Sequence, residues 1–311
     1  MKNTKVYIAL SSFAQTSSLP KELLEKSGLS FDVNLSGNRL NKKEVIERLE
    51  GYDGVIAGLE PYDAEVLNAL PDLKCISRCG VGVDNIDLKA TKAKGISVLN
   101  TPDAVIQPVA ELTLAMILDL MRHVSVHREL MRHHQWEKRM GFQLAGKTIG
   151  IIGLGRIGQR VAELLVRLDC KVIATDIRPD HRWADAHRVP IVPLEELLST
   201  SDVVTLHVTA VAGQAFQLKQ KHFAMMKRGG FLVNTARGSL LDEQDLHMAL
   251  MEGYLGGAAL DVFDQEPYKG PLCDLPNVIL TPHVATLTQE SRLDMEISAV
   301  TGLIDHFKGR S

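Results

Sequence analysis

A glycine-rich turn between a buried strand and an amphipathic helix constrains the fold of this chain more than any other stretch. The turn lies in KTIGIIGLGRIGQRVAELL, residues 147–165, where Gly153, Gly155 and Gly158 have the spacing GxGxxG. The next predicted strand ends in Asp176, at about the separation that dinucleotide-binding βαβ units require. The glycine spacing alone is weak evidence, but its position between a strand and a helix predicts a dinucleotide-binding fold.

Each glycine of the turn has an expected role. Gly153 would permit the tight turn, Gly155 would let a pyrophosphate approach the backbone, and Gly158 would let the helix pack on the strand. The backbone N–H groups near Arg156 and Ile157 would then face the pyrophosphate, because the first amides of a helix have no partner within it. A glycine turn that binds no ligand is the alternative.

Asp176 bears on which dinucleotide would bind. A carboxylate at this position should accept hydrogen bonds from the adenosine ribose hydroxyls and repel a 2′-phosphate, so the sequence favours NAD over NADP. Arg178, two residues later, is the argument against this choice, because a guanidinium can accommodate that phosphate.

Strands and helices alternate along the rest of the chain. Near-continuous apolar runs alternate with segments of period 3.6, which indicates βαβ units around parallel sheets. In the first third, strands are expected at residues 6–10, 31–35, 54–58, 75–79 and 96–100. After a helical region over 103–138, interrupted near Pro108, strands are expected at 148–153, 171–176, 189–192, 203–208, 231–236, 257–262 and 278–283.

The alternation predicts an α/β fold with two Rossmann-like, doubly wound parallel-sheet domains. The helix after Pro102 leaves the first domain, and the C-terminal helix returns to it, so the first domain is expected to be discontinuous. Its expected extent is residues 1–101 with 284–311, and the second domain is expected over 102–283.

Composition excludes several classes of function. The net charge of −3 over 311 residues gives no electrostatic case for binding nucleic acid or an anionic membrane. Residues 112–121 form the most hydrophobic helical stretch, which has about half the length needed to span a bilayer, and no secretory signal is evident. The cysteines form no CxxC pair, so we expect reduced thiols, no metal site and a cytoplasmic location. They are Cys75, Cys79, Cys170 and Cys273.

The stretch HRELMRHHQWEKRM, residues 127–140, is rich in histidine and basic residues around Trp136. A metal cluster or a nucleic-acid arm is one interpretation. However, His133 and His134 are neighbours that would point to different faces of a helix, which is poor geometry for chelation. We therefore interpret the stretch as a surface or subunit-interface helix.

Three predicted strand ends carry side chains suited to acid–base and anion chemistry. FLVNTA ends at Arg237, GAALDVF leads into DQEP with Glu266, and VILTP ends at His283. Arginine offers a bidentate fork for a carboxylate, and histidine exchanges a proton near neutral pH. Taken singly, Arg237 could form a surface salt bridge, Glu266 could be a solvated acid in a loop, and His283 could be a capping residue. Together, after a dinucleotide fold, they predict a site for hydride and proton transfer.

The motifs GLGRIG, NTARGSLLDEQDL, ALDVFDQEP and TPHVA, in this order, resemble the D-isomer-specific 2-hydroxyacid dehydrogenase family. SRCGVGVDNIDL, residues 77–88, resembles the first-domain loop of its phosphoglycerate dehydrogenase branch, and the likeness runs from about residue 50 to 295. The chain resembles a short form of that branch without the C-terminal regulatory domain, so serine feedback through such a module is not expected.

The resemblance implies roles for individual residues. Arg237 would bind the substrate carboxylate and carbonyl, His283 would be the acid/base, and Glu266 would pair with His283. Asp261 and the Thr235–Ala236 backbone are similar to positions that hold the nicotinamide amide of the cofactor. His207 and Thr209 are similar to positions that line the cofactor. The amides of Val81 and Gly82 correspond to the loop that cradles the substrate carboxylate, and Arg78 corresponds to an arginine that contacts a substrate phosphate.

The activity implied is an NAD-dependent oxidoreductase that interconverts a D-2-hydroxy acid and its 2-oxo acid, with 3-phosphoglycerate and 3-phosphohydroxypyruvate as candidates. A glyoxylate or hydroxypyruvate reductase, and a non-catalytic NAD-sensing protein similar to the family's corepressors, are the alternatives. The first domain would be the substrate-binding domain, the second would bind NAD, and a homodimer would form around the 103–140 helices. Glu60 and Leu112 depart from the branch's pattern, and Glu60 would repel a substrate phosphate if it faced the pocket.

Overall fold

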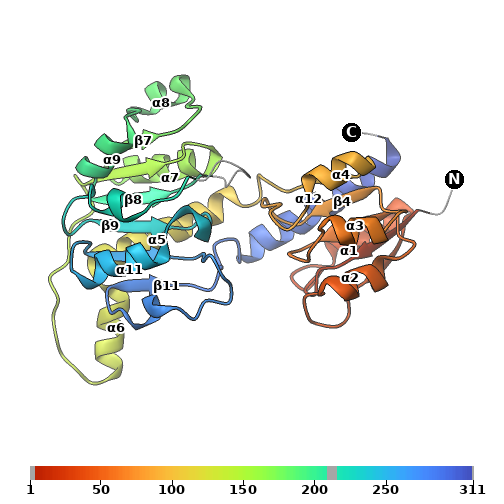
Figure 1. Ribbon diagram of the computed structural model, residues 1–311, viewed down its shortest axis with the longest axis horizontal. Helices are drawn as coiled ribbons and strands as arrows, with labels where there is room; N and C mark the ends of the chain where they lie inside the picture. Colours follow the sequence, from red (N-terminus) through yellow and green to blue (C-terminus); the bar gives the residue numbers. More distant parts are fainter. Residues whose placement is uncertain (1–3, 209–215, 310–311) are drawn as a thin grey trace. The chain divides into compact units, whose positions relative to one another are not determined.

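The computed structural model describes residues 4–208 and 216–309, which form two compact units. Unit 1 comprises Met1–Val105 with Leu287–Ser311, and unit 2 comprises Ile106–Thr286. Each unit is a parallel sheet surrounded by helices (Figure 1), which confirms the predicted α/β class with one discontinuous domain. Within the described ranges, no helix is both long enough and apolar enough to cross a membrane.

The sheet of unit 1 has five parallel strands in the order β2-β1-β3-β4-β5. They are β1 (Lys5–Ile8), β2 (Ser30–Val33), β3 (Gly54–Ala57), β4 (Cys75–Arg78) and β5 (Ser97–Leu99). Because the strand order reverses between β1 and β3, the crevice where such sheets bind ligands lies at the carboxyl ends of these central strands.

The C-terminal helix packs on the unit 1 sheet. The helices of this unit are α1 (Leu19–Ser27), α2 (Lys42–Leu49), α3 (Ala64–Ala69), α4 (Leu88–Lys94) and α12 (Gln289–Lys308). The Ser77 hydroxyl of β4 donates to the Ala299 carbonyl of α12 at 2.8 Å. The Phe307 ring lies over Gly54, where a Cβ would come within 2.7 Å of the ring. The last helix therefore completes the domain that the first third of the chain begins.

The sheet of unit 2 has six parallel strands in the order β11-β10-β9-β8-β6-β7. They are β6 (Thr148–Ile152), β7 (Lys171–Thr175), β8 (Val203–Leu206), β9 (Phe231–Asn234), β10 (Gly257–Leu260) and β11 (Val278–Leu280). The strand expected at 189–192 is only a single bridge between Ile191 and Ala174. Pro190 and Pro193 flank this bridge and lack the N–H groups that a longer ladder needs. When this bridge is counted beside β7, the strand order of the sheet is that of the Rossmann fold. The direction in which successive strands are added reverses between β6 and β8.

The long helical region breaks at a different place from the one predicted. Helix α5 (Ile106–Arg122) contains Pro108 in its first turn, where an N–H group has no helical acceptor, so the proline causes no interruption. The break lies at His123, which has a left-handed φ of 55° and precedes α6 (Val124–Arg132). No helix continues beyond Arg132 to residue 138.

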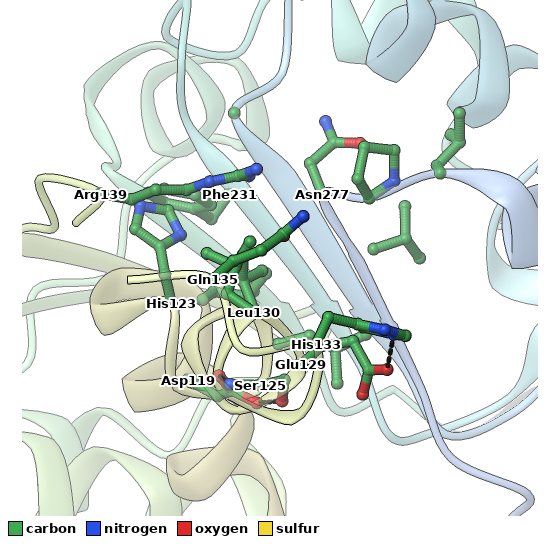
Figure 2. Close-up of a pocket in the computed structure, with 17 residues that line it drawn as sticks. Asp119, His123, Ser125, Glu129, Leu130, His133, Gln135, Arg139, Phe231 and Asn277 are labelled. Carbon is green, nitrogen blue, oxygen red and sulfur yellow. Dashed lines mark hydrogen bonds and ion pairs between the residues drawn. The ribbon is translucent and has the colours of Figure 1, made fainter. Parts of the chain in front are cut away.

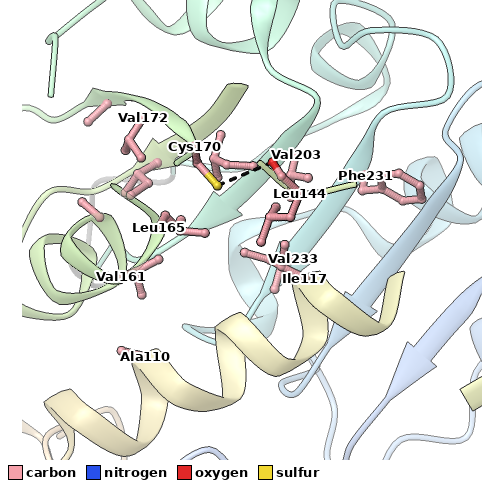
Figure 3. Close-up of a cluster of buried hydrophobic side chains, with 14 of the residues drawn as sticks. Ala110, Ile117, Leu144, Val161, Leu165, Cys170, Val172, Val203, Phe231 and Val233 are labelled. Atoms are coloured by element: carbon pink, nitrogen blue, oxygen red, sulfur yellow. Dashed lines mark hydrogen bonds between the residues drawn. The ribbon is translucent and has the colours of Figure 1, made fainter. Parts of the chain in front are cut away.

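Both faces of the unit 2 sheet are covered. The remaining helices are α7 (Arg156–Arg167), α8 (His181–His187), α9 (Leu194–Thr200), α10 (Gln220–Phe223) and α11 (Glu243–Met251). Ile149 and Ile151 of β6 lie in a cluster with Ala110 and Ile117 of α5, whereas Ile152 lies in the cluster on the opposite face. Figure 3 shows Ala110 and Ile117 on α5 in the first cluster. This two-sided burial explains why the strands read as continuous apolar runs.

Candidate functional site

The β6–α7 turn has the shape that a dinucleotide pyrophosphate needs. Gly153 has a φ of +96°, and a Cβ there would lie 2.7 Å from the His207 backbone. A Cβ at Gly158 would lie 2.1 Å from the Gly153 carbonyl oxygen, so only glycine lets α7 pack this close to β6. A Cβ at Gly155 would meet nothing within 4 Å, which leaves open space above the turn.

The N-terminus of α7 is suited to an anion. Gly155 is its N-cap and offers no side chain to the first-turn amides, which include those of Arg156 and Ile157. In a helix of 12 residues, these amides carry the positive end of the helix dipole. The turn and the helix end therefore fit the pyrophosphate of a dinucleotide.

Asp176 is fixed beside this turn at the end of β7. Its Oδ2 accepts a hydrogen bond from the Leu154 amide at 2.7 Å, and its Oδ1 accepts one from the Arg178 amide at 2.7 Å. An ionised carboxylate oxygen accepts more than one hydrogen bond, so both oxygens retain capacity for ribose hydroxyls. The Arg178 side chain is exposed.

His207 follows β8, across the topological switch point from the glycine turn. Its Nε2 lies 3.0 Å from the Thr205 hydroxyl. Burial lowers the pKa of His207 to about 3, so the imidazole is neutral at physiological pH and brings no charge to this edge of the sheet. Thr209, the other position expected here, lies outside the described residues.

The turn after β9 is held by a buried amide side chain. Asn234 Oδ1 accepts from the Ala236 amide at 3.0 Å, and its Nδ2 donates to the Arg237 carbonyl at 2.8 Å. The Thr235 hydroxyl lies 2.9 Å from the hydroxyl of Thr113 on α5. The Thr235 side chain is thus bonded to a core helix, and the Arg237 guanidinium, which donates to the Ala236 carbonyl at 2.7 Å, follows a rigid turn.

Gly238 shows why a glycine follows the arginine. A Cβ at this residue would lie 1.9 Å from the Phe263 carbonyl carbon and 2.2 Å from the Asp264 amide nitrogen. The turn that carries Arg237 therefore packs directly against the segment that leads from β10 to Glu266. Because β9 and β10 are neighbouring parallel strands, Arg237 at the end of β9 lies one strand away from the residues that follow β10.

Glu266 and His283 are paired across the ends of β10 and β11. The His283 Nδ1 lies 2.9 Å from Glu266 Oε2 and 3.1 Å from Oε1, and the Phe263 amide donates to Oε1 at 3.2 Å. Both side chains are more than a third exposed. Because Nδ1 is engaged by the carboxylate, Nε2 is the nitrogen that remains for a reacting group.

Asp261 follows β10 directly and is bonded to the loop that carries His283, and the cofactor role that the resemblance implies for it stays a prediction. The residue is fully buried, and its carboxylate accepts hydrogen bonds from Thr281, Val284 and Ala285, on both sides of His283. Its side chain is therefore engaged by the His283 loop.

In unit 1, the loop after β4 presents two backbone amides. The Gly80 amide donates to the Thr101 hydroxyl at 2.8 Å, and Asn100 Nδ2 donates to the Val81 carbonyl at 3.0 Å, so the loop is fixed. Within the described part of the chain, the Val81 and Gly82 amides donate to no protein acceptor. Successive free amides of this kind suit a carboxylate.

Arg78 and Glu60 lie at the carboxyl edge of the same sheet, and both are buried. The Arg78 guanidinium donates to the Cys79 carbonyl and lies against Gly80, where a Cβ would be 2.5 Å from Nη1. Glu60 Oε2 accepts from the Gly58 amide at 2.6 Å. Burial raises the pKa of Glu60, while the positive charges of Arg39 and Arg78 oppose that shift. Arg78 is thus electrostatically coupled to a buried carboxylate.

A cavity of about 580 Å³ in unit 2 lies at the opposite edge of its sheet (Figure 2). It is lined by α5, α6 and the amino ends of β9 and β11, including His123, Glu129, Phe231 and Val278. The dinucleotide turn follows the carboxyl end of β6, so this cavity is separate from it. The described residues contain no group of three or more His, Cys, Asp or Glu side chains able to hold a metal.

Sequence reasoning missed three residues that shape the site. The Asn234 side chain is hydrogen-bonded to the Arg237 backbone. Thr113 is hydrogen-bonded to Thr235, and Thr281 to Asp261. Asn234 is the first residue of the NTARG motif and Thr281 is the first residue of the TPH motif, so the sequence around each of them indicated a place in the site. Thr113 had none, because its contact with Thr235 depends on how α5 packs across the sheet.

Comparisons with known proteins agree with this geometry. Residues 114–285 match the NAD binding domain of the D-isomer specific 2-hydroxyacid dehydrogenases, which identifies NAD as the cofactor. The chain is 37% identical over 281 residues to a glyoxylate reductase of Thermofilum pendens, covering 86% of this chain and 82% of that protein. It is 35% identical over 293 residues to a D-3-phosphoglycerate dehydrogenase of Archaeoglobus fulgidus, covering 93% of this chain but only 55% of that protein. A crystal structure of a Thermus thermophilus protein has 34% identity and a TM-score of 0.89, covering 99% and 98% of the two chains.

Proposed function

Because this chain belongs to the D-isomer specific 2-hydroxyacid dehydrogenase family, we propose that it is an NAD-dependent enzyme that interconverts a D-2-hydroxy acid and its 2-oxo acid. The observation that carries the proposal is the Glu266–His283 pair, 2.9 Å apart, on the same sheet edge as the dinucleotide turn. Unit 2 is then the NAD-binding domain and unit 1 the substrate-binding domain. NADH, when bound, supplies the hydride to the carbonyl carbon.

The residues at the strand ends supply what the hydride transfer needs. In the reducing direction, His283 Nε2 donates a proton to the carbonyl oxygen as negative charge develops there. Glu266 holds Nδ1 and stabilises the charged ring, and the Arg237 guanidinium stabilises the oxygen and binds the carboxylate. Oxidation of the hydroxy acid runs these steps in reverse, with His283 accepting the proton.

Product chirality tests the proposed reaction. Incubation of the protein with NADH and hydroxypyruvate is expected to yield glycerate and NAD in equal amounts, with the glycerate as the D-isomer on chiral chromatography. A racemic or L-configured product would contradict the assignment, because one fixed proton donor and one hydride face give one product isomer.

The position of Asp176 predicts the cofactor preference. We expect kcat/KM to be about 10²-fold higher with NADH than with NADPH, since a carboxylate at the ribose repels a 2′-phosphate. Asp176→Ser should reduce this preference by about 10-fold or more, while Asp185→Ser, a change at an exposed aspartate on α8, should leave it unchanged. Equal specificity constants of the unchanged protein for the two cofactors would contradict the assignment.

The buried Glu60 supports an unphosphorylated substrate. Two like charges ~6 Å apart repel by about 3 kcal/mol at an effective dielectric constant of about 20. A phosphate brought to the carboxyl ends of the unit 1 strands would meet this carboxylate, and the positive charges of Arg39 and Arg78 already act on it. We therefore favour a small 2-oxo acid such as glyoxylate or hydroxypyruvate over 3-phosphohydroxypyruvate.

Substitution of Glu60 tests this substrate choice. Glu60→Gln is expected to raise kcat/KM for 3-phosphohydroxypyruvate relative to hydroxypyruvate by about 10-fold, because it removes a repelling charge. Glu47→Gln, at an exposed position on α2, should not change the ratio. Since burial raises the pKa of Glu60, the unchanged protein should discriminate less as the pH falls and the carboxylate is protonated. A strong preference of the unchanged protein for the phosphorylated acid would exclude this choice.

A homodimer is proposed around α5, α6 and the segment that follows them. Helix α6 buries none of its residues, and several large apolar side chains nearby are exposed. They are Val124, Met131, Trp136, Met140 and Phe142. Exposed apolar side chains gathered in one segment suit a second copy of the chain.

Light scattering after size exclusion tests the dimer. The unchanged protein should have twice its chain mass of 34.2 kDa, and Trp136→Glu with Met140→Glu should shift it to the monomer. Leu35→Glu is the matched control, because Leu35 is 89% exposed in unit 1 and should not affect assembly. A monomeric unchanged protein at micromolar concentration would exclude the proposed interface.

The thiols suit a reducing compartment, and we place the protein in the cytoplasm. All four cysteines are free, and three of them are buried. Burial raises the pKa of the Cys75 thiol to about 12 and that of Cys79 to about 11, so neither is a reactive thiolate.

A further inference from the structure

Helix α6 lies over a cavity instead of packing on the core. The cavity, of about 580 Å³, is bounded by this helix and by the amino ends of β9 and β11 (Figure 2). No residue of α6 is buried, although its apolar Val126 and Leu130 line the cavity opposite Phe231 and Val278 of the sheet. A space of this volume with apolar walls is typical of small-molecule sites.

The cavity lies on the face of α6 opposite to the exposed apolar residues assigned above to the dimer. The residues of α6 that line the cavity are Ser125, Val126, Glu129, Leu130 and His133. Their helical spacing places them on one side of the helix, whereas Val124 and Met131, seven residues apart, lie on the other side. A second copy that covers Val124 and Met131 therefore contacts the face of α6 that points away from the cavity.

The segment that carries Arg139 is fixed beside the cavity. The Arg139 amide donates to His127 Nε2 at 3.0 Å, and the Phe142 amide donates to the Met121 carbonyl at 2.7 Å. A Cβ at Gly141 would lie 2.6 Å from that same carbonyl oxygen, so the segment runs close against the end of α5. These contacts hold the backbone that brings the Arg139 side chain to the cavity.

The carboxylates that line the cavity already have partners. Asp119 Oδ1 accepts from the Ser125 amide at 2.8 Å, and Glu129 Oε1 lies 2.9 Å from His133 Nε2. Figure 2 shows both pairs away from Arg139. Within the described residues, the Arg139 guanidinium forms no ion pair, so this part of the cavity offers a positive charge to an anion.

Two amide side chains add hydrogen-bond donors. Gln135 and Asn277 line the cavity, and neither side chain has a hydrogen-bond partner in the part of the chain that the structure describes. An arginine binds a carboxylate bidentately, and a primary amide can donate to a further oxygen. These donors beside apolar walls suit a ligand that has a carboxylate on an apolar body.

We propose that this cavity binds a small carboxylate with an aromatic or branched apolar body, at a site separate from that of hydride transfer. The carboxylate contacts Arg139, and the apolar body lies against Leu130 and Phe231. The cavity is at the amino ends of β9 and β11, whereas Arg237 and His283 follow the carboxyl ends of these strands. The proposal does not depend on the reaction that the protein catalyses.

Isothermal titration calorimetry with 3-phenylpropionate tests the site. This acid has no 2-oxo group to reduce, and it is titrated into the full-length protein at saturating NADH. We expect a Kd on the order of 100 µM, as for other ligands of this size. Arg139→Gln should weaken binding by about 10-fold or more, because it removes a charge-assisted contact. Arg128→Gln, which removes an equal charge from an exposed position of α6, should change the Kd by less than about 2-fold.

Two further variants separate the cavity from other places where the acid could bind. Leu130→Trp fills the cavity and should abolish binding of the acid while the affinity for NADH is unchanged. Arg237→Gln should leave the Kd for 3-phenylpropionate unchanged. Loss of binding in Arg237→Gln but not in Arg139→Gln would place the acid in the substrate site and overturn the proposal. So would the absence of saturation by the unchanged protein up to about 10 mM acid.

Amide chemical shifts locate the acid without reference to its affinity. 3-Phenylpropionate should shift the amide resonances of Leu130 and Val278, while that of Gly153 in the dinucleotide turn stays in place. The monomeric variant with Trp136→Glu and Met140→Glu should bind the acid with the same Kd as the unchanged protein. If only this variant binds the acid, a second copy of the chain fills the cavity, and the proposal is wrong.

Discussion

Replacement of His283 by alanine is expected to reduce kcat by about 10²–10⁴-fold, the usual contribution of a positioned general acid. The side chain stands at the end of β11 with Nδ1 bonded to Glu266, so its loss removes the proton donor without touching the dinucleotide turn. The NADH dissociation constant should therefore change by less than about 3-fold. Steady-state kinetics with hydroxypyruvate and NADH fluorescence titration measure the two quantities.

Two further variants make this result specific. Glu266→Gln keeps a hydrogen-bonding group near Nδ1 but removes the charge, and it should lower kcat by less than His283→Ala does. His306→Ala, on α12 of unit 1, should leave kcat unchanged. Loss of NADH binding by His283→Ala, with the fold intact, would mean that the histidine belongs to the cofactor site.

Replacement of Arg237 by glutamine is expected to reduce kcat/KM by about 10²–10³-fold, the loss seen when a donor to a developing oxyanion is removed. Asn234 and Gly238 fix the backbone of the turn that carries the guanidinium, and the guanidinium itself donates to the Ala236 carbonyl. Kinetics with glyoxylate and hydroxypyruvate at saturating NADH give the measurement.

The lysine variant shows which property of Arg237 matters. Arg237→Lys keeps the positive charge but loses the bidentate fork, so it should recover only part of the lost activity. Arg228→Gln, at an exposed position before β9, is the charge-matched control. If Arg237→Gln keeps kcat/KM within about 3-fold of the unchanged protein, the anion site lies elsewhere.

The strands and the glycine turn could be predicted because their signals are local. Buried parallel strands read as apolar runs, and the three glycines stand where a Cβ either would clash or would fill the pyrophosphate space. The placement of Arg237, Glu266 and His283 at the same end of the sheet could also be predicted, because each follows a strand and parallel strands have their carboxyl ends on the same side of a sheet.

Other features depended on long-range packing. The sequence predicts an interruption of the helix near Pro108, but a proline in the first turn removes no helical hydrogen bond. The 189–192 run looked like a full strand, but its prolines allow only one bridge. The burial of Arg78 beside Glu60 depends on how the loops after β3 and β4 meet, which spacing along the chain does not encode.

The most direct test of the central claim is the rate of NADH oxidation with glyoxylate, hydroxypyruvate, pyruvate, 2-oxoglutarate and 3-phosphohydroxypyruvate. The loss of NADH absorbance should show rapid turnover with at least one unphosphorylated 2-oxo acid, and His283→Ala should abolish most of it. Tight binding of NADH with no turnover on any of the five acids would contradict the account and would instead indicate a protein that binds the cofactor without reducing these acids.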